Sequence, residues 1–244
     1  MKVLDRKKNP PIVDAVNFKL NLKPYQKFVL DNGVEVYAVD AGAEEVLQTE
    51  WIFSAGNAQE EKNLVAATTN FLLRNGTSTK TAFQINEQFD YYGSYINRAC
   101  YNETATITLH SLTRHIDNLL PKVRELITDS VMPQEELSIY QQNMKQRLKV
   151  SLKKSDFVAG RMIDVYLYGE KHPYGKFSRA EDFDALGREQ LLNFYKKYYQ
   201  QGKMVLFVAG KLPADLAPLL NQYFGDLPNA VSYTHLTLPT SDLV

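Results

Sequence analysis

The chain has 244 residues, and 28 Lys and Arg balance 28 Asp and Glu, so its formal net charge is zero. A balanced charge gives no general attraction to nucleic acid or to an anionic membrane surface. The lone Cys100 excludes an internal disulfide. Residues 1–18 lack the apolar run of a signal peptide, and no stretch approaches the ~18 apolar residues of a membrane span. We therefore expect a soluble, cytoplasmic protein.

The first half of the chain alternates between strand and helix patterns after a Pro- and Lys-rich arm at residues 1–24. Asp-Asn-Gly divides two apolar runs in 27–40, which predicts a hairpin because Asn-Gly tolerates positive φ. The other predicted elements in this half are a strand at 46–56, helices at 60–74 and 81–93, and strands at 94–101 and 104–112. Thr81 is the predicted N-cap of the second helix.

The second half is mainly helical. Helices are predicted at 114–129, at 133–160 with a continuation to Tyr168 and a bend near Gly160, at 188–199 and at 213–227, and a buried strand is predicted at 203–210. Early strands, later helices and one returning strand favour an α+β fold. We expect an antiparallel-rich mixed sheet with helices packed on one face.

The C-terminal segment 231–244, VSYTHLTLPTSDLV, does not continue this pattern. It resembles the translated adaptor remnant found at the ends of genes cut short by sequencing. We expect it to be non-native, so that the natural protein continues past Ala230. The predicted organisation is an arm at 1–24, one domain at 25–230 and this tail.

Several motifs occur in an order that resembles one known family. They are LDNGVEVYAVD, SAGNAQEEKNLVAATTNFLLRNGT, FDYYGSYINRACYNETATITL, MPQEELSIYQQNMKQRL, HPYG and FYKKYYQQGKMVLFVAGK. Together they resemble the N-terminal half-domain of the M16 (insulinase/pitrilysin, mitochondrial-processing-peptidase-like) metallopeptidases over residues 25–228. The resemblance implies the LuxS/MPP-like metallohydrolase fold.

Active members of that family carry His-x-x-Glu-His on the helix after the third strand. The two histidines bind Zn²⁺, and the glutamate acts as general base on the zinc-bound water. Aligned on Gly76 and Thr77, the motif falls on Ala67, Asn70 and Phe71. Alanine and phenylalanine offer no lone pair, and asparagine does not take a proton from water near pH 7.

A further glutamate, on a later helix, completes the metal site in active members. Here Gln146 or Arg147 occupies that place, and no carboxylate lies between Gln141 and Lys149. The resemblance therefore implies a member that has lost its metal site. The residues around Asn70 form either a plain packing helix or a pseudo-active site that still contacts peptide.

Two other groups of residues are candidate sites. Tyr95, Asn97 and Arg98 lie on a predicted edge strand where active family members hold extended peptide, although Arg98 replaces a residue that is usually small. His110, His115 and Cys100 form an alternative, atypical zinc site. The basic residues of the long helix form either a solvated face or a chamber wall that attracts acidic peptide.

The resemblance implies a non-catalytic subunit, without peptidase activity or bound cofactor, that completes a peptide-holding chamber with a zinc-motif partner. Zinc is expected only in active members of the family. The alternatives are an active zinc-dependent endopeptidase with an atypical site, or a purely structural subunit of a larger assembly. Neither nucleic acid nor a membrane is an expected partner.

Overall fold

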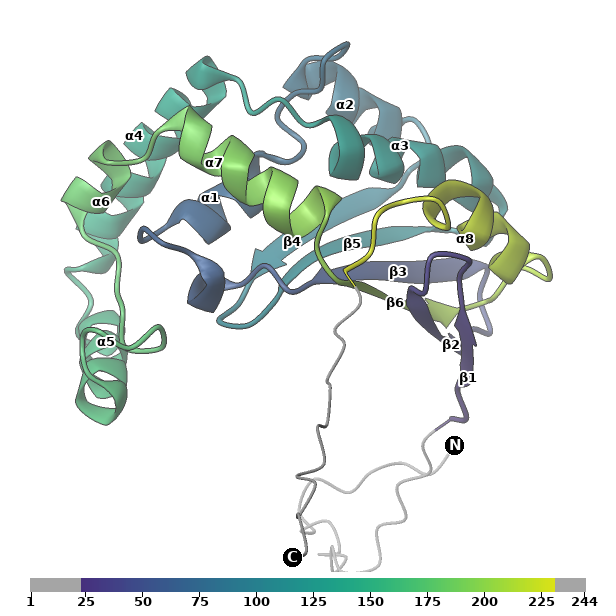
Figure 1. Ribbon diagram of the computed structural model, residues 1–244, viewed down its shortest axis with the longest axis horizontal. Helices are drawn as coiled ribbons and strands as arrows, with labels where there is room; N and C mark the ends of the chain where they lie inside the picture. The colour runs from purple at the N-terminus through teal and green to yellow at the C-terminus, as the bar shows by residue number, and fades with distance from the viewer. Residues whose placement is uncertain (1–22, 231–244) are drawn as a thin grey trace, which may run out of the picture.

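The computed structural model describes residues 23–230, and in this range six strands form one sheet in the order β1-β2-β6-β3-β5-β4 (Figure 1). The strands are β1 (Gln26–Val29), β2 (Glu35–Asp40), β3 (Val46–Phe53), β4 (Tyr95–Cys100), β5 (Ala105–Leu112) and β6 (Met204–Gly210). β2 and β6 pair in parallel, and the other neighbours pair antiparallel. The predicted antiparallel-rich mixed sheet is confirmed.

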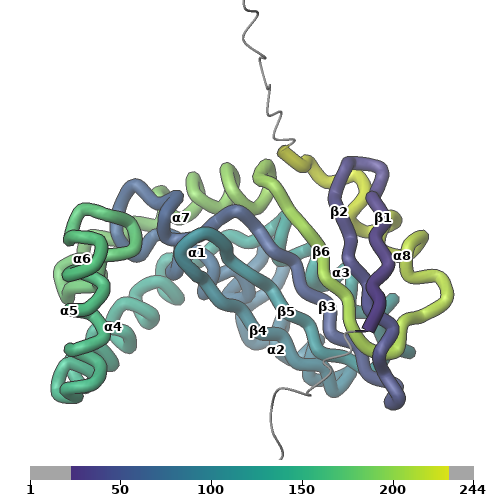
Figure 2. Tube along the Cα trace, turned by 90° about the horizontal axis from the view of Figure 1, so that it is seen from below, coloured from purple at the N-terminus to yellow at the C-terminus, as the bar shows by residue number. Residues whose placement is uncertain are grey.

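Helices cover one face of this sheet (Figure 1). The helices of the described range are α1 (Val65–Leu72), α2 (Ala82–Asp90), α3 (Ile116–Asp129), α4 (Gln134–Ser151), α5 (Ser155–Tyr168), α6 (Ala180–Asp184), α7 (Arg188–Tyr195) and α8 (Leu216–Phe224), and α4, α5 and α6 lie beyond the edge of the sheet. Figure 2 shows the molecule from the helix-free side, with α4, α5 and α6 projecting to one side of the sheet. None of the helices described here is both long and apolar enough to cross a bilayer.

The predicted hairpin joins β1 to β2. Gly33 has φ +84°, the left-handed conformation that a tight turn needs and that glycine adopts without strain. Asn32 ties the turn to the end of α8, because its side-chain amide donates to the Phe224 carbonyl at 2.8 Å and to the Leu227 carbonyl at 2.7 Å. The hairpin is therefore fixed by both local and long-range contacts.

The core lies between the sheet and its helices. Along β3 the inward-facing side chains are buried and alternate with more exposed ones, as expected when one face of a strand meets the helices. Trp51 is fully buried, and its ring lies 5.2 Å from that of Phe224 in α8. Phe53 lies 4.7 Å from Tyr199, in the π-helical turn Lys196–Gln200 that follows α7.

The predicted long helix is broken at a different place from the one expected. α4 ends at Ser151 and α5 begins at Ser155, whereas Gly160 lies inside α5 without a break. The N–H groups of Lys153 and Lys154 donate to carbonyls three residues earlier, and Lys154 is then extended. This tightened last turn ends the helix, so the predicted bend near Gly160 is wrong.

β6 is only half buried, although a buried strand was predicted. Both of its edges are paired, but alternate side chains face the helix-free side. Phe207 on that side is 43% exposed and stacks on Tyr37 at 5.1 Å. The prediction assumed cover on both faces, whereas helices cover only one.

The predicted tail at 231–244 lies outside the described residues, as does the predicted arm except for Lys23 and Pro24.

Candidate functional site

The helix that carries the motif positions is α1, and its first turn is capped by a side chain from the preceding loop. Glu60 accepts hydrogen bonds from the N–H groups of Leu64 at 3.2 Å and Ala66 at 2.9 Å. A carboxylate suits this helix end because the free N–H groups carry partial positive charge. Burial nevertheless raises the pKa of Glu60. The sequence prediction missed this cap and began the helix at residue 60 instead of 65.

Asn70 points into the protein interior. It is 2% exposed, and its side-chain nitrogen donates to the Thr106 carbonyl at 3.2 Å and to the Tyr199 hydroxyl at 3.1 Å. Burial raises the pKa of Tyr199, so this hydroxyl remains protonated at neutral pH. The geometry favours the packing interpretation of Asn70 over the peptide-contact interpretation.

Phe71 lies on the outer side of α1, 42% exposed, with the half-buried Ala67 one turn before it. Its ring centroid is 4.7 Å from that of Tyr140 in α4 and 4.9 Å from the guanidinium carbon of Arg98 in β4. The Arg98 guanidinium also donates to the Phe71 carbonyl, at the C-terminal end of α1. An aromatic ring and a cation thus occupy the space beside the two ligand positions.

Arg98 is a largely desolvated cation. Burial, and next the nearby charge of Arg74, lower its pKa to about 9, so it stays charged at pH 7. Its Nε atom is buried and has no hydrogen-bond partner within residues 23–230. Arg74 is also partly buried, and it donates to the Ile96 carbonyl of β4 at 3.2 Å. Positive charge therefore gathers where the family's motif would hold a cation.

The two candidate positions on α4 point in different directions. Arg147 follows Tyr140 by seven residues, which is about two helical turns, so both side chains leave the same face. The charge of Arg147 also acts on the Tyr140 hydroxyl. Gln146 instead lines the cleft between α4, α5 and α6. Of the two, only Arg147 lies on the side of Phe71.

β4 is an edge strand of the sheet, as predicted for the peptide-binding candidates. Side chains alternate along it, so Arg98 faces α1 whereas Tyr95 and Asn97 face the helix-free side. Tyr95 is 60% exposed, and its ring lies 5.7 Å from His110. The three predicted residues thus share a strand without sharing a face.

The atypical zinc site is not assembled. Cys100 pairs with Ala105 and Tyr95 pairs with His110, which places Cys100 and His110 at opposite ends of the β4–β5 pair, roughly 17 Å apart. Zinc ligands must lie within about 2.3 Å of one ion. His115 packs on Tyr92, with 5.3 Å between their ring centroids, and burial raises the pKa of the Cys100 thiol to about 12. The sequence hypothesis rested on closeness along the chain, which the strand register does not preserve.

The donor set at the motif positions does not fit zinc. Ala67 and Phe71 supply no ligand atom, and Arg98 and Arg147 bring positive charge to the same region. Within residues 23–230, no three His, Cys, Asp or Glu side chains are grouped so as to hold a metal ion.

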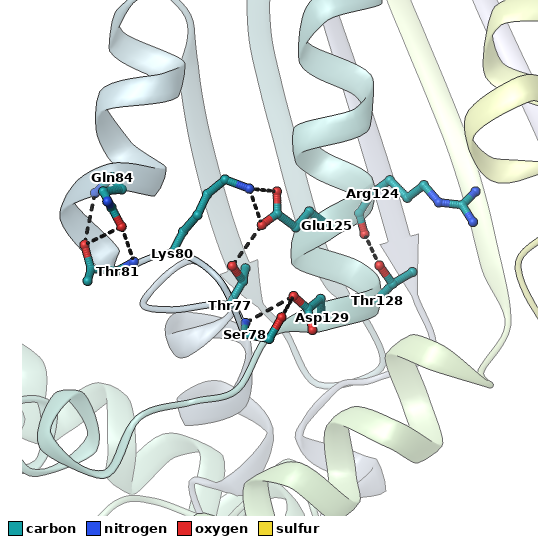
Figure 3. A network of polar contacts seen from close by, with 9 residues as sticks. All are labelled: Thr77, Ser78, Lys80, Thr81, Gln84, Arg124, Glu125, Thr128 and Asp129. Carbon is teal, nitrogen blue, oxygen red and sulfur yellow. Dashed lines mark hydrogen bonds and ion pairs between the residues drawn. The ribbon is translucent and has the colours of Figure 1, made fainter.

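The loop after α1 is fixed to α3 by a network of polar contacts (Figure 3). Glu125 accepts a hydrogen bond from Thr77 at 2.8 Å and forms an ion pair with Lys80 at 2.6 Å. Ser78 donates to Asp129 through both its N–H, at 3.1 Å, and its hydroxyl, at 2.6 Å. This network holds the C-terminal end of α1 and hence the position of Phe71.

Replacing Glu125 with alanine is expected to lower the free energy of unfolding by about 1–3 kcal/mol, because two charge-assisted contacts are lost at a mostly covered site. Urea denaturation measures the change. Glu87→Ala is the matched control, since Glu87 is exposed in the middle of α2 and has no side-chain partner in the described range. Equal midpoints for the two variants would refute the structural role of the network.

Comparison with known proteins gives consistent matches. The sequence model described as peptidase M16 inactive domain matches residues 185–243. An uncharacterized zinc protease of Rickettsia felis is 28% identical over 142 residues, covering 57% of this chain and 34% of that protein. Subunit 1 of the mitochondrial cytochrome b-c1 complex of Caenorhabditis elegans is 20% identical over 202 residues, covering 82% of this chain and 43% of that protein.

A solved structure shares the fold. The peptidase M16 inactive domain from Pseudomonas fluorescens matches with a TM-score of 0.76 at 22% identity, covering 85% of this chain and 52% of that one. The chain spans only about a third to a half of the length of these relatives. The resemblance expected from the order of the sequence motifs is confirmed: the chain is similar in sequence to M16 peptidases and shares the fold of a solved M16 inactive domain.

Proposed function

We propose that this protein is a non-catalytic M16 homologue that completes a peptide-holding chamber with a catalytic partner subunit. The observation that carries the proposal is the geometry at α1. The motif positions hold Ala67, Asn70 and Phe71, and the Arg98 guanidinium lies against the Phe71 ring.

This chain lacks the side chains for both functions of the motif, which are zinc binding and proton abstraction from the zinc-bound water. Zinc-dependent hydrolysis needs ligands with lone pairs and a base that takes a proton from the bound water. Asn70 is no base, and its amide is already engaged inside the protein. Arg147, on the α4 face toward Phe71, would repel a dication. These losses support a non-catalytic role.

The edge of β4 supports the peptide-holding part of the proposal. An exposed edge strand binds extended peptide through main-chain hydrogen bonds without demanding a particular sequence. Tyr95 and Asn97 are exposed along this strand and provide side-chain contacts beside it. Residues 95–100 are therefore the proposed docking strand.

The partner is proposed from the relatives. The chain covers only part of their length, and one of them is a subunit of a larger complex. A chamber needs more protein than this domain supplies. The proposed partner carries His-x-x-Glu-His in the same register.

The purified chain is expected to retain far less than one zinc per molecule after incubation with zinc and dialysis at pH 7.5, because the donor set is missing. Elemental analysis of the dialysed protein measures the ratio. A homologue with an intact His-x-x-Glu-His motif, treated in parallel, should retain about one zinc. Stoichiometric zinc in this chain would remove the proposal.

A purely structural subunit is the second candidate. It is favoured by Arg74, which already occupies the Ile96 carbonyl on the β4 edge and so leaves fewer main-chain groups for peptide. Affinity purification from the native host separates the two candidates. A zinc-motif homologue that co-purifies and cleaves peptide only together with this chain supports the first. A complex lacking such a homologue supports the second.

A further inference from the structure

Three arginines surround the position where the metal motif falls. Arg98 contacts the Phe71 ring, Arg74 acts on the pKa of Arg98 through its charge, and Arg147 acts in the same way on Tyr140, which packs on Phe71. None of the three forms an ion pair within residues 23–230, although five other basic residues there do. The cluster is thus positive and lacks a counter-ion in the described part of the chain.

Arg98 uses little of its hydrogen-bonding capacity. A guanidinium has five N–H donors. In the described structure, one nitrogen of Arg98 donates to the Phe71 carbonyl, and Nε is buried without a partner. A desolvated cation without a counter-ion is unfavourable, and an anion with acceptor oxygens is what would offset that penalty.

A structural role explains only part of this arrangement. The bond from Arg98 to Phe71 satisfies a free carbonyl at the end of α1, where positive charge is favourable. That role needs one donor and one arginine. It accounts neither for the unpaired Nε nor for the nearby charge of Arg74, which makes it less favourable for Arg98 to stay charged at this helix end.

We propose that Arg98, flanked by Arg74 and Arg147, binds a carboxylate of an extended peptide lying along the β4 edge, at the position where the family's metal motif falls. The inference rests on the proposed peptide-holding function and names its ligand class. A carboxylate matches the planar guanidinium, which can bind its two oxygens together. It comes from an Asp or Glu side chain or from the C-terminus of the peptide.

Three octapeptides test the proposal, each bearing an uncharged fluorophore at its N-terminus. The first has a central Glu and an amidated C-terminus, the second has Gln in place of Glu, and the third is the Gln peptide with a free C-terminal carboxylate. Fluorescence anisotropy gives their dissociation constants for the purified chain. At least one carboxylate peptide is expected to bind about tenfold or more tightly than the neutral one, and this preference should shrink as salt rises.

Substitutions of the arginines test whether they cause the preference for carboxylate peptides over the neutral peptide. Arg98→Gln should bring the affinity ratio of acidic to neutral peptide close to one without weakening the neutral peptide, and Arg98→Lys should restore part of the ratio. Arg147→Gln, at an exposed position, should lower the ratio with little risk to folding. Lys149→Gln is the control, because Lys149 is exposed on α4 but lines the cleft toward α6. Circular dichroism verifies that each variant is folded.

The outcomes separate this inference from the function on which it rests. Equal binding of all three peptides overturns the carboxylate site and leaves peptide holding intact. Binding of none overturns both. If Arg98→Gln does not fold, the affinity ratios of acidic to neutral peptide for Arg98→Lys and Arg147→Gln test the site instead. If both ratios equal that of the unmodified chain, the proposed carboxylate site is wrong.

Discussion

Replacing Trp51 with alanine is expected to lower the free energy of unfolding by about 3–5 kcal/mol. Trp51 is fully buried on β3, and its ring packs on Phe224 of α8, so the truncation opens a cavity between the sheet and the helices. For a chain of this size, the melting temperature should fall by roughly 10 °C. Thermal unfolding followed by circular dichroism measures the change.

Two variants act as controls for this prediction. Trp51→Phe keeps an aromatic ring and removes an indole N–H that has no hydrogen-bond partner in the described structure, so its destabilisation should be only about 1 kcal/mol. Phe207→Ala removes a large but 43% exposed ring on the helix-free face and should also have a small effect. If all three variants lost the same stability, Trp51 would not be the centre of the sheet–helix core.

The parts of the fold that the sequence predicted have local causes. Asp-Asn-Gly predicted the β1–β2 hairpin because the turn conformation depends on those residues themselves. Thr81 was predicted as an N-cap, and the structure shows a complete capping box in which Thr81 and Gln84 each accept a hydrogen bond from the other's N–H. Such features need no knowledge of the tertiary structure.

The errors in the fold have causes beyond the local pattern. The break between α4 and α5 falls at residues 152–154, where neither glycine nor proline marks a helix end. The short α6 was not predicted, and its Phe183 is buried in the core. The exposure of Phe207 depends on which face of the sheet the helices cover. These features are set by packing partners that are distant in sequence.

At the candidate site, the order of the motifs placed Ala67, Asn70 and Phe71 on α1 but gave no account of their surroundings. The contact of Arg98 with Phe71 depends on the alternation of side chains along β4 and on the packing of α1 against it. Cys100 and His110 illustrate the converse, because residues ten apart in sequence lie at opposite ends of a strand pair. Sequence identified what was lost from the motif, and only the structure shows what replaced it.

Restoring the family's glutamate alone, as Asn70→Glu, is expected to destabilise the protein by about 3 kcal/mol or more relative to Asn70→Gln at pH 8. Glu and Gln have nearly the same shape, so the pair isolates the charge and the lost N–H donors. The amide of Asn70 donates to the Thr106 carbonyl, and a carboxylate cannot donate to it. Chemical denaturation of the two variants measures the difference.

The difference in the free energy of unfolding between Asn70→Glu and Asn70→Gln should become smaller as the pH falls. Burial raises the pKa of the introduced glutamate in the folded state above its unfolded value of about 4.3. The penalty is therefore fully present above the folded-state pKa, shrinks by about 1.4 kcal/mol per pH unit between the two values, and vanishes below the unfolded value. A difference that stayed constant from pH 8 to pH 4.5 would mean that position 70 reaches solvent. Asn70 would then be accessible to peptide, and the packing role assigned to it would be wrong.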